Sequence, residues 1–284
     1  MHGRQTKTLL VRGGGIRQVG PMSRRQFLEL VGTASLIAAC GPAGPRGGPR
    51  AVKTAAAAPR IRAVAFDLFT LFDPRGVDAR VAEVLGAGAP LAATWKTRLF
   101  EYCWIRAAAG KYVSFDQLVR DSLDYAAATH GLALDQPQRA RLASVFSELS
   151  LWSDTAETLS ALRARGLRLA PLANYAPAMI ERLLGRAGIR EMFEDLISTD
   201  RARTYKPDPR AYALAESAFG LSREEIAFAA FGGWDAAGAK WHGYPTFWVN
   251  RLRAAPDVLV EVDAVGDSLA ALAEWLEKGD GTGG

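Results

Sequence analysis

Four polar side chains stand at or just beyond the ends of predicted strands, where they could carry out chemistry: Asp67, Asn174, Thr199 and Asp235. A carboxylate can act as a nucleophile or as a general acid or base. An aspartate after an apolar strand can equally cap the next helix, so one such position carries little information. Several together are a stronger sign, because parallel α/β sheets bind ligands at the carboxyl ends of their strands. The sequence therefore predicts a functional site at that edge.

Apolar runs of strand length alternate with helical patterns along most of the chain. The runs span residues 61–69, 167–174, 195–199, 225–231 and 245–250, and the later helical patterns span 176–187, 209–219 and 236–241. Strands that alternate with helices predict a parallel sheet with helices on both faces. We therefore expect an α/β fold with a Rossmann-like sheet, in which residues 61–74 and 156–278 form the core domain.

Residues 75–155 break this alternation, because they contain helical patterns and no clear strand. The patterns span residues 77–85, 91–109, 114–129 and 135–149. An all-helical insert directly after the first strand predicts a cap subdomain over the end of that strand. Such a cap can exclude water from a site and shape its pocket.

Two further motifs extend the set that begins with Asp67. "TYKPDPRAY" places Lys206 between a strand and a helix, and "FGGWDAAGA" places Asp235 after the fourth strand. This order of an acid, a lysine and a second acid resembles the haloacid dehalogenase superfamily. "FDLFTLFD", "WKTRLFEYCWIR", "KYVSF" and "WDAAGAKWHGYPTFWVNR" are similar to landmarks of its type II (L-2-haloacid) dehalogenases. The resemblance runs from about Arg62 to Trp275, and its most specific part is the cap motif.

That resemblance implies a metal-independent hydrolase acting on a small 2-substituted carboxylic acid. Asp67 would displace the leaving group from the α-carbon and form an ester, which water would then hydrolyse. Lys206 would keep Asp67 ionised and oriented, because a nearby cation favours the charged form of a carboxyl group. Asp235 would pair with Lys206 or help to activate water.

The same resemblance implies a set of substrate-binding residues. Tyr212 matches a tyrosine near the substrate carboxylate, Asn174 matches the asparagine of the second motif, and Lys96 stands where an arginine receives the halide. The apolar pocket positions correspond to Phe69, Phe100, Phe115 and Trp234. An aromatic wall suits a small halogenated carbon skeleton.

Phe69 separates chemistry at carbon from chemistry at phosphorus. Phosphoryl-transferring relatives carry a second aspartate two residues after the nucleophile, where it serves as general acid. Here that position is Phe69, and a phenyl ring cannot protonate a leaving group. A phosphatase is therefore the less favoured alternative. We expect no cofactor, since only that alternative would need magnesium.

Several positions depart from the family pattern. After the nucleophile, Thr70 and Leu71 replace a Gly-Thr pair, and Lys96 replaces an arginine. Ala173 and Ala230 replace two serines, and Gly232 replaces an asparagine. The serine at position 173 would bind the substrate carboxylate, and each lost hydrogen bond to a charged group can cost about 1.5–3 kcal/mol. A non-catalytic or re-purposed small-molecule-binding protein therefore remains an alternative. The substrate and its leaving group stay open.

The N-terminal segment predicts export. Arg24 and Arg25 precede an apolar run at 30–39, which is shorter than a membrane span and ends in "IAAC" at Cys40. Residues 1–40 resemble a twin-arginine signal with a lipobox, which implies lipidation of Cys40 and a periplasmic, membrane-anchored lipoprotein. A frayed, alanine-rich helix is the alternative interpretation.

Charge is unevenly distributed along the chain, whose net charge is +5. Residues 1–60 contain ten Lys or Arg residues and one acid, whereas the rest contains 25 basic and 29 acidic residues. That body has no basic stripe with interleaved aromatic residues, which argues against nucleic-acid binding. Its histidines, His130 and His242, are isolated and predict no metal site.

Residues 41–60 are rich in Gly, Pro and Ala and predict a flexible tether. The family resemblance alone suggests a homodimer.

Overall fold

A six-stranded parallel sheet organises the protein, with the strand order β3-β2-β1-β4-β5-β6. The strands are β1 (Ala63–Phe66), β2 (Arg168–Ala173), β3 (Ile197–Ser198), β4 (Ile226–Ala230), β5 (Thr246–Val249) and β6 (Ala264–Gly266). The computed structural model describes residues 60–87 and 89–281, so the predicted signal and Cys40 lie outside the described residues. The predicted parallel α/β sheet is confirmed, and β6 is an additional strand that the sequence did not reveal.

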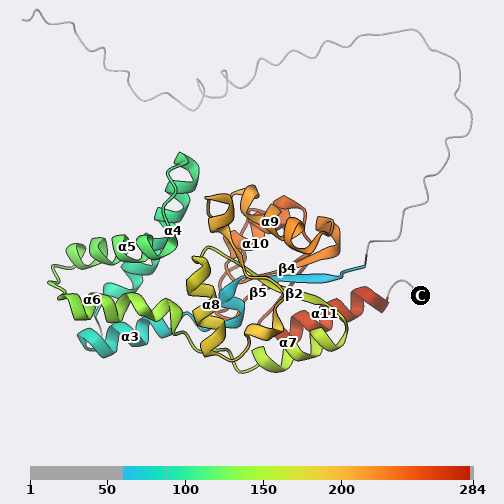
Figure 1. Ribbon diagram of the computed structural model, residues 1–284, viewed down its shortest axis with the longest axis horizontal. Helices are drawn as coiled ribbons and strands as arrows, with labels where there is room; N and C mark the ends of the chain where they lie inside the picture. Colours follow the sequence, from blue (N-terminus) through green and yellow to red (C-terminus); the bar gives the residue numbers. More distant parts are fainter. Residues whose placement is uncertain (1–59, 88, 282–284) are drawn as a thin grey trace, which may run out of the picture. The chain divides into compact units, whose positions relative to one another are not determined.

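Helices cover both faces of this sheet (Figure 1). On one face lie α7 (Thr155–Ala164), α8 (Pro177–Arg186) and α11 (Leu269–Gly281), and on the other lie α9 (Pro209–Phe219) and α10 (Gly233–His242). Short helical turns connect these elements: α2 (Leu68–Leu71), η2 (Arg190–Met192), η3 (Thr199–Ala202) and η4 (Arg223–Glu225). Two buried cores result, one on each side of the sheet.

The central strand β1 shows why the sequence reads as a continuous apolar run. All four of its residues are fully buried. Because side chains alternate along a strand, Val64 and Phe66 enter one core while Ala63 and Ala65 enter the other. A strand of a parallel sheet is buried on both faces and therefore lacks polar positions. The chain becomes polar only where β1 ends.

A helical insert follows β1 and consists of α3 (Gly76–Leu85), α4 (Leu91–Ala109), α5 (Phe115–Thr129), α6 (Gln136–Ala143) and η1 (Ser144–Ser147). Figure 1 shows these helices, in blue-green to green, at one end of the sheet. Within the insert, the buried Trp95 of α4 donates an indole hydrogen bond to the Val119 carbonyl of α5 at 3.0 Å. The insert is all-helical as expected, and the exact subdomain boundaries at 74/75 and 155/156 stay predictions.

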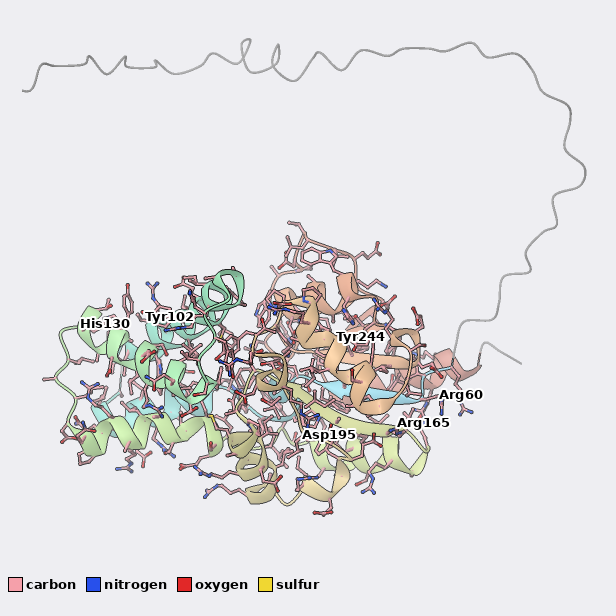
Figure 2. All side chains as sticks on the ribbon, turned by 45° about the horizontal axis from the view of Figure 1, so that its top comes forward. Arg60, Tyr102, His130, Arg165, Asp195 and Tyr244 are labelled. Carbon is pink, nitrogen blue, oxygen red and sulfur yellow. The ribbon has the colours of Figure 1, made fainter. Side chains whose placement is uncertain are left out.

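The amino ends of the strands face away from this insert. Figure 2 shows Arg60 and Arg165 at that far edge, and Tyr102 and His130 on the insert. Arg60 and Arg165 line a shallow surface groove beside Arg168, the first residue of β2. In the described part of the chain, none of the helices is both long and apolar enough to cross a membrane.

Candidate active site

Asp67 stands where β1 ends and serves two purposes there. Its backbone N–H donates to the Ala229 carbonyl of β4 at 2.9 Å, which continues the sheet pairing to the strand's tip. Its Oδ1 accepts a hydrogen bond from the Phe69 N–H at 2.8 Å and so caps α2. Its Oδ2 accepts from the Lys206 ammonium at 2.6 Å. Capping and the pairing with lysine thus use different oxygens of one carboxylate.

Lys206 joins the two acids of the predicted set. Its Nζ lies 2.6 Å from Asp67 Oδ2 and 2.8 Å from Asp235 Oδ2, and its side chain is only 1% exposed. Burial alone would lower the pKa of Lys206, but the charges of Asp235 and Asp67 outweigh burial and raise it. The lysine therefore remains a cation between two carboxylates.

The loop that carries Lys206 is held from two sides. The Lys206 backbone N–H donates to Asn174 Oδ1 at 2.9 Å, which links the loop to the end of β2. On the insert side, the Tyr205 hydroxyl donates to the Val113 carbonyl at 2.5 Å. Tyr112 also donates a hydrogen bond to Asp200 of η3. These contacts connect the segment between α4 and α5 to the loop bearing the cation.

Asp235 lies behind the lysine, on the first turn of α10, and is fully buried. Burial raises the pKa of this carboxyl to about 6, Lys206 acts to lower it, and the Asp67 charge raises it further. Asp235 does not line the cavity beside Asp67. Of the two roles expected for it, the geometry favours pairing with Lys206 over contact with water.

Tyr212 occupies a different place from the one expected. Its hydroxyl donates to Asp235 Oδ1 at 2.7 Å, and the residue is fully buried on α9 and does not line the cavity. Gly238 of α10 makes this approach possible, because a Cβ there would collide with the Tyr212 hydroxyl and lie 2.9 Å from Pro207 Cβ. Tyr212 therefore supports the acid behind the lysine and stands outside the wall of the cavity.

A cavity of about 230 Å³ opens at Asp67, between the sheet and the insert. Seven of the predicted residues line it: Asp67, Phe69, Lys96, Phe100, Phe115, Asn174 and Trp234. Pockets for drug-sized ligands span roughly 300–1,000 Å³, so this cavity suits a smaller molecule. Phe69 is one of the lining residues, and its ring centroid lies 6.4 Å from that of Phe100 and 5.8 Å from that of Phe231. The wall beside Asp67 is thus mainly apolar and rich in aromatic rings.

Two cations lie at this cavity, and each is held by its own acid. Lys96 Nζ is 2.6 Å from Asp78 Oδ2, so the structure pairs the expected halide-receiving lysine with an aspartate of the insert. Arg75, which the sequence did not single out, pairs with Asp73 at 2.6 Å. Both positive charges are therefore partly neutralised by neighbouring carboxylates.

The departures from the family pattern have visible consequences. Ala173 and Gly232 line the cavity and contribute no polar group, while Ala230 is buried in a core. The Thr70 hydroxyl donates to the Asp67 carbonyl at 2.7 Å and so contacts the backbone of that residue. A Cβ at position 232 would lie 2.8 Å from Trp234 Nε1, so the glycine leaves room for that indole.

Tyr175 is the main cavity residue that sequence reasoning missed. It follows Asn174 directly, and Phe146, Phe231 and Leu252 join it as further lining residues. The available signal was its place at the end of the second strand, beside a residue already singled out. Its aromatic character alone did not distinguish it from a core residue.

No group of three or more His, Cys, Asp or Glu side chains in residues 60–87 and 89–281 is arranged to hold a metal ion. The two site carboxylates, Asp67 and Asp235, share the ammonium of Lys206.

Comparison with known proteins places these features in a family. The sequence model for haloacid dehalogenase-like hydrolases matches residues 61–243. The chain is 38% identical over 227 residues to the (S)-2-haloacid dehalogenase of Pseudomonas sp. (strain YL), covering 78% of this chain and 97% of that protein. It is 39% identical over 202 residues to haloacetate dehalogenase H-2 of Moraxella sp. (strain B), covering 70% of this chain and 90% of that protein.

Among solved structures, L-2-haloacid dehalogenases also match this chain. The L-2-haloacid dehalogenase RSc1362 matches with a TM-score of 0.75 and 38% identity, over 77% of this chain and all of that one. The Xanthobacter autotrophicus L-2-haloacid dehalogenase with chloropropionic acid covalently bound matches with a TM-score of 0.71 and 31% identity. That match covers 76% of this chain and 98% of the other.

Proposed function

Because the chain belongs to the haloacid dehalogenase-like hydrolase family, we propose that it hydrolyses small 2-halogenated carboxylic acids. One observation carries this proposal: Asp67, held by Lys206 at 2.6 Å, lines a small, mainly apolar cavity rich in aromatic rings. The relatives named above act on such acids or on haloacetate by their printed names.

In the first step, an oxygen of Asp67 attacks the carbon that bears the halogen. A carbon–oxygen bond forms, the carbon–halogen bond breaks, and the halide leaves with the bonding electrons. Lys206 holds the attacking carboxylate by a hydrogen bond and an ion pair, and the aromatic wall excludes water that would otherwise shield the nucleophile. The product of this step is an ester between Asp67 and the substrate.

In the second step, water attacks the carbonyl carbon of that ester. The ester bond to Asp67 breaks, a 2-hydroxy acid leaves, and the carboxylate is restored as one proton is released. The residues that perform both steps belong to this chain, and the proposed reaction uses no cofactor. Phe69 lies where a phosphatase would need its acid, so phosphate transfer is the less favoured activity.

Halide release is the direct test. Purified protein should release chloride from 2-chloropropionate and halide from haloacetates, and Asp67→Asn should lower the rate by several orders of magnitude. No release from any acid of the panel, at high enzyme concentration, would refute the dehalogenase activity. Magnesium-dependent release of p-nitrophenol from p-nitrophenyl phosphate would favour the phosphatase alternative.

A second candidate function is non-catalytic binding of a small molecule, which the loss of polar side chains at Ala173 and Gly232 favours. Turnover in oxygen-18 water separates the two functions. Because water attacks the ester carbonyl, a catalyst incorporates the label into the peptide that contains Asp67. A binding protein leaves that peptide unlabelled, as does Asp67→Asn.

We also propose that the protein is exported through a twin-arginine signal, anchored by a lipid on Cys40, and homodimeric. The sequence motifs at 1–40 support export and anchoring, and the family resemblance supports the dimer. Cell fractionation tests the first two: Arg24→Lys with Arg25→Lys should retain the chain in the cytoplasm. Cys40→Ser should shift it from the membrane to the soluble fraction, and analytical ultracentrifugation should give twice the chain mass.

A further inference from the structure

The hydroxyl of Tyr175 is a buried polar group that the protein itself does not satisfy. The residue is 3% exposed, and no hydrogen-bond partner for its hydroxyl occurs in the part of the chain that the structure describes. Buried polar groups nearly always have a partner, because leaving one unpaired is costly. An unpaired hydroxyl on a residue that lines the cavity is a candidate to bind a ligand.

Neighbouring rings hold the Tyr175 side chain in place. Its ring stacks on Phe115 at a centroid distance of 4.6 Å. The rings of Phe69 and Phe146 meet it edge-on, each at 6.2 Å. Because packing on three sides restricts the side-chain torsions, the hydroxyl is fixed before any ligand binds. A donor fixed in this way binds without a further loss of conformational freedom.

The Tyr175 side chain forms part of the wall of the reaction cavity. Tyr175 lines it together with Asp67, and burial and the charge of that aspartate both raise the pKa of the phenol. The phenol is therefore protonated at neutral pH and can donate a hydrogen bond. Ala173 is the last residue of β2, Tyr175 lies two residues beyond it, and both residues line this cavity.

We propose that the Tyr175 hydroxyl donates a hydrogen bond to the carboxylate of the substrate, in place of the serine that the family pattern implies at Ala173. This inference rests on the proposed function and names a residue that recognises its substrate class. The serine that would occupy position 173 reaches the cavity from a short side chain. Tyr175 supplies the same chemical group from the neighbouring wall.

Charge balance identifies the substrate's carboxylate as the group that needs this donor. An anionic substrate must approach the negative Asp67, while the cations at the cavity, Lys96 and Arg75, are each paired with an acid. A hydrogen bond to a charged acceptor is roughly twice as strong as one between neutral groups. A fixed, protonated phenol in an apolar wall therefore contributes both binding energy and orientation.

Tyr175→Phe tests the assignment, because it removes only the hydroxyl and preserves the ring. Isothermal titration calorimetry of the full-length protein with propionate, an unreactive carboxylate, should show affinity weakened about 10–100-fold in this variant. Binding of neutral propionamide should change much less. These measurements do not depend on turnover, so they test the inference even if no halide is released.

Thermal unfolding provides a second readout, with Tyr244→Phe as the matched control. Tyr244 is buried near α10 and its hydroxyl donates to the Tyr212 carbonyl at 2.5 Å (Figure 2). Loss of this hydrogen bond in Tyr244→Phe should lower the melting temperature by about 2–4 °C. Tyr175→Phe should leave the melting temperature unchanged or raise it, because its hydroxyl has no protein partner to lose.

Three outcomes would overturn the inference. The first is equal propionate affinity of Tyr175→Phe and wild type; if wild type still releases halide, the proposed function survives. The second is weakened binding of chloride or bromide with unchanged binding of propionate, which would assign the hydroxyl to the leaving halide. The third is a wild-type protein that binds neither propionate nor 2-chloropropionate at millimolar concentration.

Discussion

The hydroxyl of Tyr212 lies 2.7 Å from Oδ1 of Asp235, while Oδ2 of the same carboxylate accepts the Lys206 ammonium at 2.8 Å. A buried acid thus receives one neutral and one charged donor. Since Lys206 in turn binds Asp67, a chain of hydrogen bonds runs from the interior of α9 to the nucleophile. Substitution of Tyr212 should therefore change the position or charge of Lys206 and, through it, the reactivity of Asp67.

The protonation of Asp235 should have opposite effects on turnover and stability. Its pKa is raised to about 6 by burial, against an unfolded value of about 4. Between these values the folded state binds the proton more tightly, so this group's contribution to stability grows as the pH falls and is lost as the pH rises through 6. Turnover should instead fall below about pH 6, because a neutral Asp235 holds Lys206 less firmly. Wild type and Asp235→Asn should differ accordingly in pH–rate profiles and urea unfolding.

Tyr212→Phe should shift the acidic limb of the pH–rate profile to higher pH. The lost hydrogen bond favours the charged form of Asp235, so its removal raises the pKa of that carboxyl further. The free energy of unfolding should fall by about 1.5–3 kcal/mol, the range for hydrogen bonds to charged groups. Tyr244→Phe should leave the limb in place, because the Tyr244 hydroxyl donates to a backbone carbonyl and not to Asp235.

Lys206→Met should be among the most damaging single substitutions. It leaves two carboxylates without their shared cation, and breaking a buried ion pair costs about 3–5 kcal/mol. Adding Asp235→Asn should recover part of that loss, because one uncompensated charge is then removed. Urea unfolding of both single variants and the double variant measures this coupling. Lys240→Met, which breaks an exposed pair with Asp263, should cost no more than about 1 kcal/mol.

Gly238→Ala should disturb the active site from outside the cavity. The added methyl group would collide with the Tyr212 hydroxyl and lie 2.9 Å from Pro207, so one helix must shift. Overpacking of this kind costs about 1–3 kcal/mol, and the halide-release rate should fall with it. Gly185→Ala on α8 is the control, since no atom lies within 4 Å of a Cβ there. It should be neutral or gain up to about 1 kcal/mol of stability.

The parallel sheet could be predicted because its signal is local, whereas Asp67, Lys206 and Asp235 were singled out together by an order along the chain that resembles a known family. A strand buried on both faces is a continuous apolar run, and the polar residue that ends it marks the sheet's reactive edge. β6 escaped prediction because it has only three residues, Ala264–Gly266, and none is buried. Without a buried face, a strand has no hydrophobic pattern.

The finer features of the site depend on packing between distant elements. Tyr212 was expected at the substrate, but the close approach allowed by Gly238 places its hydroxyl on Asp235. Tyr175 was missed because a hydroxyl without a partner is a property of the folded surroundings. Lys96 stands at the expected position, and its partner Asp78 could not be foreseen from spacing along the chain.

The two donors on Asp67 have a consequence for the second half of the proposed reaction. Oδ1 receives the Phe69 amide and Oδ2 receives Lys206, so each oxygen has a donor of its own. When one oxygen becomes the ester bridge, the other becomes the acyl oxygen and keeps its donor. That donor polarises the carbonyl and stabilises the negative charge that builds up as water adds to it. If Oδ2 attacks, the amide that caps α2 in the resting protein becomes the oxyanion hole, and if Oδ1 attacks, Lys206 takes that role.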